Sequence, residues 1–308
     1  MRKKGISMAA AAFLLTAGLC SGCGAQEEQQ FTAKHTGENG VQDKNQDKDN
    51  ASQKTTSGGE DEYYIFDLNE NVERTAVTYQ NRYGIRISGD LYMAKDLDKN
   101  TVHPALIIGP PYGGVKEQGP GVYANELAQR GFIVLTFDPS FNGESGGEPR
   151  HVSSPDIFTE DFSAGVDYLG TLEYVNREGI GAVGICGSGG FALAAAQVDT
   201  RIQAVATASL FDVSVSGAGL DREQWVETME TLAKQRWSDV DNGEPQYLPT
   251  YPEEPTEEIP EELEGIWAEF YSFYGTERGH HPHALGGFTT TSNSAFYNFQ
   301  LLNHLNQL

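Results

Sequence analysis

Hydrophobic and polar positions divide the chain into two regions. From residue 24 to about residue 62 nearly every position is polar or small. From residue 63 onward, short apolar runs return, separated by glycine-rich turns or by segments with helical spacing. The first region cannot bury enough apolar surface to offset its ordering entropy. We therefore expect a tether over residues 23–62 and a folded domain over residues 63–308.

The apolar runs predict strands that alternate with helices. Strands are expected at 72–79, 84–93 (with a bend or bulge at Ser88-Gly89-Asp90), 103–109, 132–137, 180–185 and 204–210. Helices are expected at 123–130, from Ser154-Pro155-Asp156 to about residue 172, and at 190–197. This alternation is typical of an α/β fold with a mostly parallel sheet covered on both faces. The two leading strands should form an antiparallel edge.

The alternation ends after residue 212. Residues 221–288 are rich in aromatic side chains and contain an acidic, proline-rich stretch at 244–264. One helical face is predicted to carry Leu263, Trp267, Phe270 and Tyr274. We interpret 221–288 as a cap inserted over the carboxyl edge of the sheet, where open α/β sheets bind ligands. The last twenty residues predict a polar loop followed by a helix with Phe296, Phe299, Leu302 and Leu305 on one face.

A glycine-rich turn follows the strand at 180–185 and opens a helix. Cys186 has Gly184 two places before it and Gly187 directly after it. A nucleophile elbow needs such small neighbours because its turn is strained. The helix N-terminus should lower the pKa of the thiol. Ser188 remains the alternative nucleophile, in a register shifted by two residues; the steric argument favours Cys186.

An oxyanion hole needs one backbone N–H after the nucleophile and another from the loop after an earlier strand. Gly187 would supply the first. Pro110 and Pro111 have no N–H, so either Tyr112 or Gly113 would supply the second.

Four segments resemble the α/β-hydrolase superfamily, and within it the dienelactone-hydrolase-like bacterial members. They follow the family order at 113–118, 142–149, 184–190 and 278–282. The resemblance implies a carboxyl-ester or related acyl hydrolase whose acid and histidine follow later strands. No strand-like run follows residue 210, so we expect the last core strands to be missing and the chain alone to be weak or inactive. A partner chain could then complete the open sheet edge.

Three residues remain as candidates for the acid and the base within this chain. Asp212 follows the last predicted strand, and His280 and His281 lie in the predicted cap. Histidines in such a segment are more often structural than catalytic. His304, near the end of the chain, is expected on a helix surface.

The N-terminus predicts export. Three basic residues precede a short apolar run that closes on Ser21-Gly22-Cys23. Residues 1–22 fit a lipoprotein signal peptide, with Cys23 as the lipidated residue. We expect attachment to the extracytoplasmic face of the cell membrane through this lipid alone. Cys186 would then be the only cysteine of the mature chain, which excludes an intramolecular disulfide.

Composition limits the other function classes. A net charge of −23 argues against nucleic acid as a partner. No metal-ligand spacing is evident, and no cofactor is expected. The segment 187–192 also fits a dinucleotide-binding fingerprint, but that motif belongs after the first strand of its unit, so this reading ranks last. The remaining alternative to a hydrolase of small ester-like molecules is a ligand-binding lipoprotein without catalysis.

Overall fold

The computed structural model describes residues 63–217 and 219–308. The predicted signal peptide, the lipidation site Cys23 and the tether lie outside these residues. Within the described part of the chain, no helix is long and apolar enough to cross a membrane.

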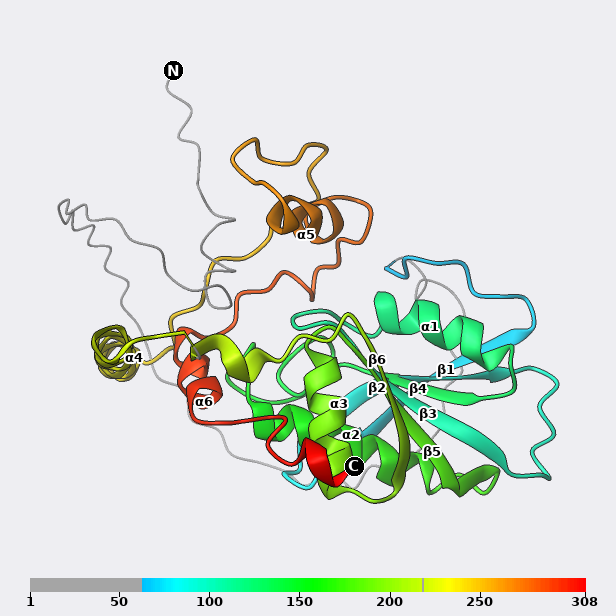
Figure 1. Ribbon diagram of the computed structural model, residues 1–308. Coiled ribbons are helices and arrows are strands. Elements are labelled where there is room, and N and C mark those ends of the chain that lie inside the picture. Colours follow the sequence, from blue (N-terminus) through cyan, green and yellow to red (C-terminus); the bar gives the residue numbers. More distant parts are fainter. Residues whose placement is uncertain (1–62, 218) are drawn as a thin grey trace, which may run out of the picture.

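A six-stranded mixed sheet forms the centre of the fold, with the strand order β1-β2-β4-β3-β5-β6 (Figure 1). The strands are β1 (Val72–Gln80), β2 (Arg86–Ala94), β3 (His103–Gly109), β4 (Ile133–Phe137), β5 (Val175–Ile185) and β6 (Ile202–Ala208). The first two pair antiparallel with each other, and β2 pairs antiparallel with β4. The pairs β4–β3, β3–β5 and β5–β6 are parallel. The predicted fold class is therefore confirmed, with antiparallel leading strands and a parallel core.

Neighbouring residues of a strand face opposite sides of the sheet. Both faces carry apolar side chains, and helices cover both. Ile107 packs into a cluster with residues of α2 (Pro155–Leu169) and α3 (Ser188–Val198). Its neighbour Ile108 packs on the other face, against Ala124 and Ala128 of α1 (Gly119–Ala128). Nearly continuous burial along β3 and β4 is the reason these strands are apolar runs rather than alternating ones.

Several predicted boundaries and one predicted irregularity are wrong. The helix α1 begins at Gly119, four residues before its predicted start, because Pro120 occupies its first turn. The register of β1 and β2 is continuous through Ser88, Gly89 and Asp90, so these residues form no bulge. A bulky side chain at Gly89 would collide with the Thr136 carbonyl of β4, 2.6 Å from an added Cβ. That glycine allows close strand pairing instead of a bend.

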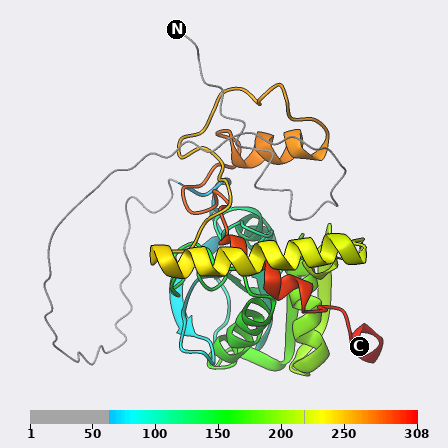
Figure 2. The same ribbon diagram turned by 90° about the vertical axis from the view of Figure 1, so that its left-hand side faces the viewer.

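The segment after β6 forms a short 3₁₀ turn η1 (Val213–Gly217), and then α4 (Arg222–Asn242) and α5 (Ile266–Tyr274). Asp221 and Gln224 cap the start of α4 reciprocally, and Gly243 ends it in the left-handed conformation. Leu263 lies before α5, so only the later members of its predicted helical face are helical. Figures 1 and 2 show α5 standing apart from the layers around the sheet, and Figure 2 shows α4 running across one side of the body.

The C-terminal region is more irregular than predicted. It contains η2 (Thr290–Ser292), the short helix α6 (Asn293–Tyr297) and η3 (Leu305–Gln307), rather than one helix through Leu305. Phe296 and Leu301 are buried against the α3 side of the core, and this packing overrides the helical spacing. His304 lies in a turn, where its backbone N–H donates to Gln197.

Candidate active site

Cys186 occupies a sharp turn between β5 and α3. Its φ angle is 52°, in the left-handed region that residues other than glycine rarely adopt. The turn brings α3 against the end of β5 so closely that a Cβ at Gly184 would lie 2.2 Å from the Ser188 carbonyl. The glycine two places before Cys186 is therefore a steric requirement of the turn. This is the strand-turn-helix geometry of a nucleophile elbow.

Two backbone N–H groups face the Cys186 sulfur. They belong to Gly187, directly after it, and to Tyr112, in the loop that follows β3. The thiol is partly exposed, and Cys186 is free. Burial raises the pKa of the thiol more than the two N–H groups lower it, so the N–H at the start of α3 acts in the predicted direction but the predicted net lowering of the thiol pKa is wrong. The thiol is the resting form of this side chain at neutral pH.

Ser188 lies elsewhere. It is the first residue of α3, it is buried, and its side chain faces the end of β3. A Cβ added to Gly109 would lie 2.8 Å from the Ser188 hydroxyl oxygen. The rival register would need Ser188 at the tip of the turn, whereas the residue at the tip is Cys186.

The loop that carries the Tyr112 N–H is held in place by its own side chains. The Tyr112 hydroxyl donates to Ser153 Oγ at 2.8 Å, and its ring lies 4.4 Å from the ring of Phe288. Gly113 adopts a φ of 84°, which allows the chain to turn directly after the donor. The position of the Tyr112 N–H therefore depends on Ser153 and Phe288, which lie far from it in the sequence.

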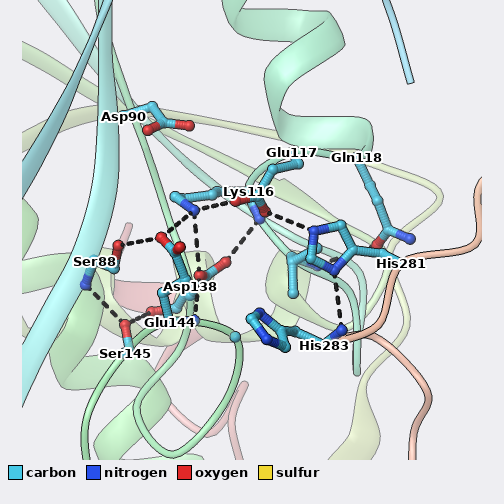
Figure 3. A network of polar contacts seen from close by, with 12 residues as sticks. Ser88, Asp90, Lys116, Glu117, Gln118, Asp138, Glu144, Ser145, His281 and His283 are labelled. Carbon is cyan, nitrogen blue, oxygen red and sulfur yellow. Dashed lines mark hydrogen bonds and ion pairs between the residues drawn. The ribbon is translucent and has the colours of Figure 1, made fainter. Parts of the chain in front are cut away.

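A buried charged network lies further along the same loop (Figure 3). Lys116 Nζ contacts Glu117 and lies 2.9 Å from Glu144 Oε2 and 3.6 Å from Asp138 Oδ2. Burial by itself would lower the pKa of Lys116, but the surrounding carboxylates raise it well above its ordinary value. The ammonium group remains charged and holds these acidic side chains together.

Asp138 connects this network to the backbone. Its carboxylate accepts N–H groups from Lys116 at 2.9 Å and from Glu144 at 2.8 Å. A Cβ at Gly143 would lie 2.3 Å from the same carboxylate, so this position requires glycine. The two loops that resemble the family at 113–118 and 142–149 are therefore joined through one buried aspartate.

Glu117, Asp138 and Glu144 also form a set of oxygen donors within 4.8 Å of one another, of the kind that binds divalent cations. Lys116 Nζ lies among all three. The Lys116 ammonium group already neutralises part of the negative charge of these carboxylates. We therefore interpret them as ion-pair partners of Lys116 rather than as ligands of a metal ion.

His281 belongs to this network. Its Nδ1 accepts the backbone N–H of His283 at 3.1 Å, and its Nε2 lies 3.7 Å from Glu117 Oε2. Burial, followed by the charges of nearby His283 and Lys116, lowers the pKa of His281 to about 3. Both ring nitrogens face other partners, and the ring is neutral at pH 7. These contacts favour a structural role over that of a base.

The other two acid and base candidates also have local partners. His280 Nε2 lies 3.0 Å from the carbonyl oxygen of Pro252, within the cap. Asp212 accepts the N–H and the hydroxyl of Ser214 at the start of η1. Among the described residues, no hydrogen bond or ion pair joins Cys186 to Asp212, His280 or His281. The structure brings together Cys186, Gly187 and Tyr112, and it does not bring the triad candidates to them.

Two residues near the site were not assigned a role from the sequence. Gln118 is almost fully buried, and it links the loop after β3 to Gly279 in the cap. Tyr274, at the end of α5, has a phenol whose pKa is raised, first by burial and then by the charge that Cys186 can carry. Gln118 lies within the family-like segment 113–118, which was the one feature of the sequence that could have indicated its role.

Comparisons with known proteins identify relatives in bacteria. The uncharacterized protein PA2218 of Pseudomonas aeruginosa PAO1 is 44% identical over 255 residues, which cover 79% of this chain and 66% of that protein. The uncharacterized protein YcjY of Escherichia coli K12 is 36% identical over 228 residues, covering 71% of this chain and 72% of YcjY. The chain thus spans about two thirds of PA2218. No protein-family model matches the chain.

Solved structures show the same fold. The crystal structure of PA2218 aligns with a TM-score of 0.75 at 42% identity, covering 83% of this chain and 79% of that one. The α/β hydrolase GrgF of Penicillium sp. sh18 aligns with a TM-score of 0.57 at 22% identity, covering 76% of this chain and 75% of that one.

A fungal relative also matches in sequence over a shorter stretch. Thiohydrolase aneE of Aspergillus aculeatus is 31% identical over 137 residues, covering 44% of this chain and 42% of that protein. The fold, the elbow and the bacterial relatives agree: the chain belongs to the α/β-hydrolase superfamily, in the family that includes YcjY and PA2218.

Proposed function

We propose that this protein catalyses acyl transfer from a small ester or thioester, with Cys186 as the nucleophile. The observation that carries the proposal is the pair of N–H groups, from Gly187 and Tyr112, that face one sulfur at the tip of an elbow. A tetrahedral intermediate on that sulfur would place its oxyanion beside the same donors. The names thiohydrolase and α/β hydrolase, borne by relatives, support acyl chemistry of this kind.

The proposed first step is acylation. Cys186 loses its proton to solvent or to a buffer base, and the thiolate attacks the substrate carbonyl carbon. A C–S bond forms while the carbonyl electron pair moves to oxygen, where the N–H groups of Tyr112 and Gly187 stabilise the charge. Collapse of the intermediate breaks the bond to the leaving alkoxide or thiolate, which takes a proton from water. The product is an acyl thioester on Cys186.

The second step needs a base that activates water or another acceptor. Within the described ranges, the contacts of the histidine candidates are made elsewhere, so neither His280 nor His281 is in place to activate water against the acyl group. We therefore propose that acylation outpaces deacylation, so that the acyl-enzyme accumulates and turnover is weak. Loss of triad members can still leave about 10³-fold acceleration over water.

Stoichiometric acylation tests the proposal. The purified chain is mixed with S-phenyl thioacetate, and released thiophenol and intact mass are followed with time. We expect a burst of one acetyl group per chain, mapped by peptide mass spectrometry to Cys186 and absent from Cys186→Ala. An acetyl group found on Ser188 instead would refute the assignment of the nucleophile. No burst at any pH would refute the function and leave a ligand-binding scaffold.

We also propose that the protein is exported and held at the membrane by lipid on Cys23, as the N-terminal sequence suggests. Expression in a bacterium with radiolabelled palmitate should label the wild type but not Cys23→Ala. An unlabelled wild type recovered wholly in the soluble fraction would refute this proposal.

We further propose that a second chain adds a strand to the sheet at the free edge of β6. In the described ranges, β6 pairs with β5 and forms one end of the sheet. Its sequence lacks the charges and prolines that usually protect an edge. Light scattering that gives a monomer mass at all concentrations would contradict pairing with a second chain.

A further inference from the structure

The strand beside the elbow ends in a second strained residue. Ser209 directly follows β6, and its φ angle is 50°, close to the 52° of Cys186. Among the described residues other than glycine, only Phe141 and His151 share a positive φ with these two. Such backbone conformations cost free energy and cluster at functional sites. A strained residue next to the nucleophile therefore indicates a role in the site.

Backbone hydrogen bonds place Ser209 directly opposite Cys186. In the parallel register of β5 and β6, Ile185 is opposite Ala208, so Cys186 and Ser209 form the next pair. The Cys186 N–H donates to the Ala208 carbonyl oxygen at 2.9 Å, and the Cys186 carbonyl oxygen accepts the Phe211 N–H at 3.0 Å. Neighbouring strands lie about 4.8 Å apart, so one substrate molecule can contact both residues.

The chain bulges at this position. A regular parallel ladder would bring the N–H of Leu210 to the Cys186 carbonyl, but the donor is Phe211, one residue later. A bulge of this kind redirects a side chain beside an active site. Leu210 packs against the first turn of α3, where a Cβ added to Gly189 would lie 3.1 Å from Leu210 Cγ. Ser209 is exposed, and its hydroxyl has no hydrogen-bond partner in the described part of the chain, so it is available to a substrate.

The strand order puts Ser209 and the oxyanion donor on opposite sides of the nucleophile. The strand β5, which leads into Cys186, lies between β3 and β6. Tyr112 follows β3 and reaches the elbow, because a Cβ added to Gly187 would lie 2.8 Å from Tyr112 Cβ. Ser209 follows β6. When the oxyanion of a tetrahedral intermediate lies beside the two N–H donors, the β6 side is left for another substituent of the same carbon.

We propose that the Ser209 hydroxyl donates a hydrogen bond to the leaving atom of the substrate and thereby selects oxygen esters as acyl donors. This inference rests on the proposed function, because it names the substrate class for the same nucleophile. As the carbon–oxygen bond breaks, its electron pair moves to the leaving oxygen, which accepts the Ser209 hydrogen bond and then takes a proton from water. Ser209 keeps its own proton. A leaving thiolate gains less, because sulfur is a weak hydrogen-bond acceptor.

Two substrates that differ in one atom test this selection. Phenyl acetate and S-phenyl thioacetate carry the same acyl group and the same ring, and acetylation of Cys186 by each is followed by intact mass and peptide mapping. Phenoxide, from a phenol with a pKa of about 10, is a poor leaving group, so its departure should limit the rate. Thiophenolate is less basic and leaves more readily, so the attack should limit the rate instead. The ratio of the two acetylation rates therefore reports on help to the leaving oxygen.

Variants separate the hydroxyl from the backbone strain. Ser209→Ala should lower the ratio of the phenyl acetate rate to the thioester rate by about 5- to 10-fold, the size of one net hydrogen bond. Ser209→Gly should lose as much, although glycine adopts a positive φ without strain. Ser209→Asn keeps a donor and tolerates this conformation, so its ratio should stay within about threefold of the wild type. The control Thr207→Ala removes an exposed hydroxyl from β6 itself and should match the wild type.

Three results would overturn the inference. The ratio could stay unchanged in both Ser209→Ala and Ser209→Gly, or it could fall in Ser209→Ala alone, which would assign the effect to strain. The third is an equal loss in both acetylation rates and in alkylation of Cys186 by iodoacetamide, which would show a structural effect on the elbow. In each case Cys186 can still be acetylated by S-phenyl thioacetate, whereas the proposed function fails only if that acetylation is absent.

Discussion

Replacing Gly187 by alanine should separate oxyanion stabilisation from thiol reactivity. Gly187 has ordinary helical backbone angles, φ −59° and ψ −36°, so alanine introduces no backbone strain there. The added Cβ would, however, lie 2.8 Å from Tyr112 Cβ and 3.4 Å from Tyr112 N. The Cβ of a tyrosine cannot rotate away, so the Tyr112 loop must move by about half an ångström or more to reach ordinary van der Waals contact.

That movement withdraws one of the two donors from the oxyanion. Loss of a single oxyanion donor slows acyl transfer by about 10²- to 10³-fold. Displacement of about half an ångström should cost less than full removal, so we expect acylation of Cys186 by S-phenyl thioacetate to slow about 10- to 100-fold. Alkylation by iodoacetamide forms no oxyanion, and its rate should change by less than about threefold.

The control is Gly219→Ala, because no atom lies within 4 Å of a Cβ added there. Its acylation and alkylation rates should both match the wild type. Thermal unfolding should show that Gly187→Ala is folded. Equal losses in acylation and alkylation would refute the reasoning, since they would place the effect on the thiol rather than on the oxyanion. An unchanged acylation rate would show that the two N–H groups do not act on the transition state.

Three further outcomes are expected. Burial raises the pKa of the Cys186 thiol, so its alkylation rate should rise about tenfold per pH unit. The rate should continue to rise above about pH 8.5, where the rate of a free thiol levels off. A plateau below about pH 8 would contradict this prediction. Ser188→Ala should keep the acetylation burst of Cys186 within about threefold, since its buried hydroxyl faces away from the tip of the elbow. Lys116→Met should lower the free energy of unfolding by about 3–5 kcal/mol in urea, because it leaves buried carboxylates unpaired. The matched Lys99→Met, in an exposed pair with Glu73, should cost less than about 1 kcal/mol, and equal losses would disprove the importance of burial.

The sequence alone predicted the two parts of the site that depend on local backbone geometry, the elbow and the loop of the second N–H donor. The elbow could be predicted because its glycines stand within a few residues of Cys186, and Gly184 is required by its contact with Ser188 inside the same turn. The sequence limited the second donor to Tyr112 or Gly113, because the two prolines before them have no N–H, and the structure has the Tyr112 N–H facing the sulfur. Both inferences needed only the chemistry of neighbouring residues.

Long-range packing decided what the sequence could not. His281 and Asp212 are residue types suited to a triad, but their partners come from the backbone of His283 and from Ser214. The predicted bulge at Gly89 failed because the glycine accommodates a strand almost 50 residues away. Glycine has a special role at both positions, but the partner of Gly184 is Ser188 in the same turn, whereas the partner of Gly89 is Thr136 on another strand, which the local sequence does not indicate.

Three of the four family-like segments meet in the charged network, while the fourth, 184–190, is the elbow itself. Lys116, Glu117 and Glu144 lie in two of the matching segments, and their contacts are made with one another. Glu117 also faces His281, which joins a third segment to the same cluster. The buried charges of Lys116 and Asp138 are costly to bury and are stabilised only when their partners are in place. Such a cluster specifies one arrangement of the oxyanion loop and the cap, because a shifted loop would leave several charges without partners. The three segments outside the elbow therefore act on Cys186 indirectly, by fixing the position of the loop that carries the Tyr112 N–H.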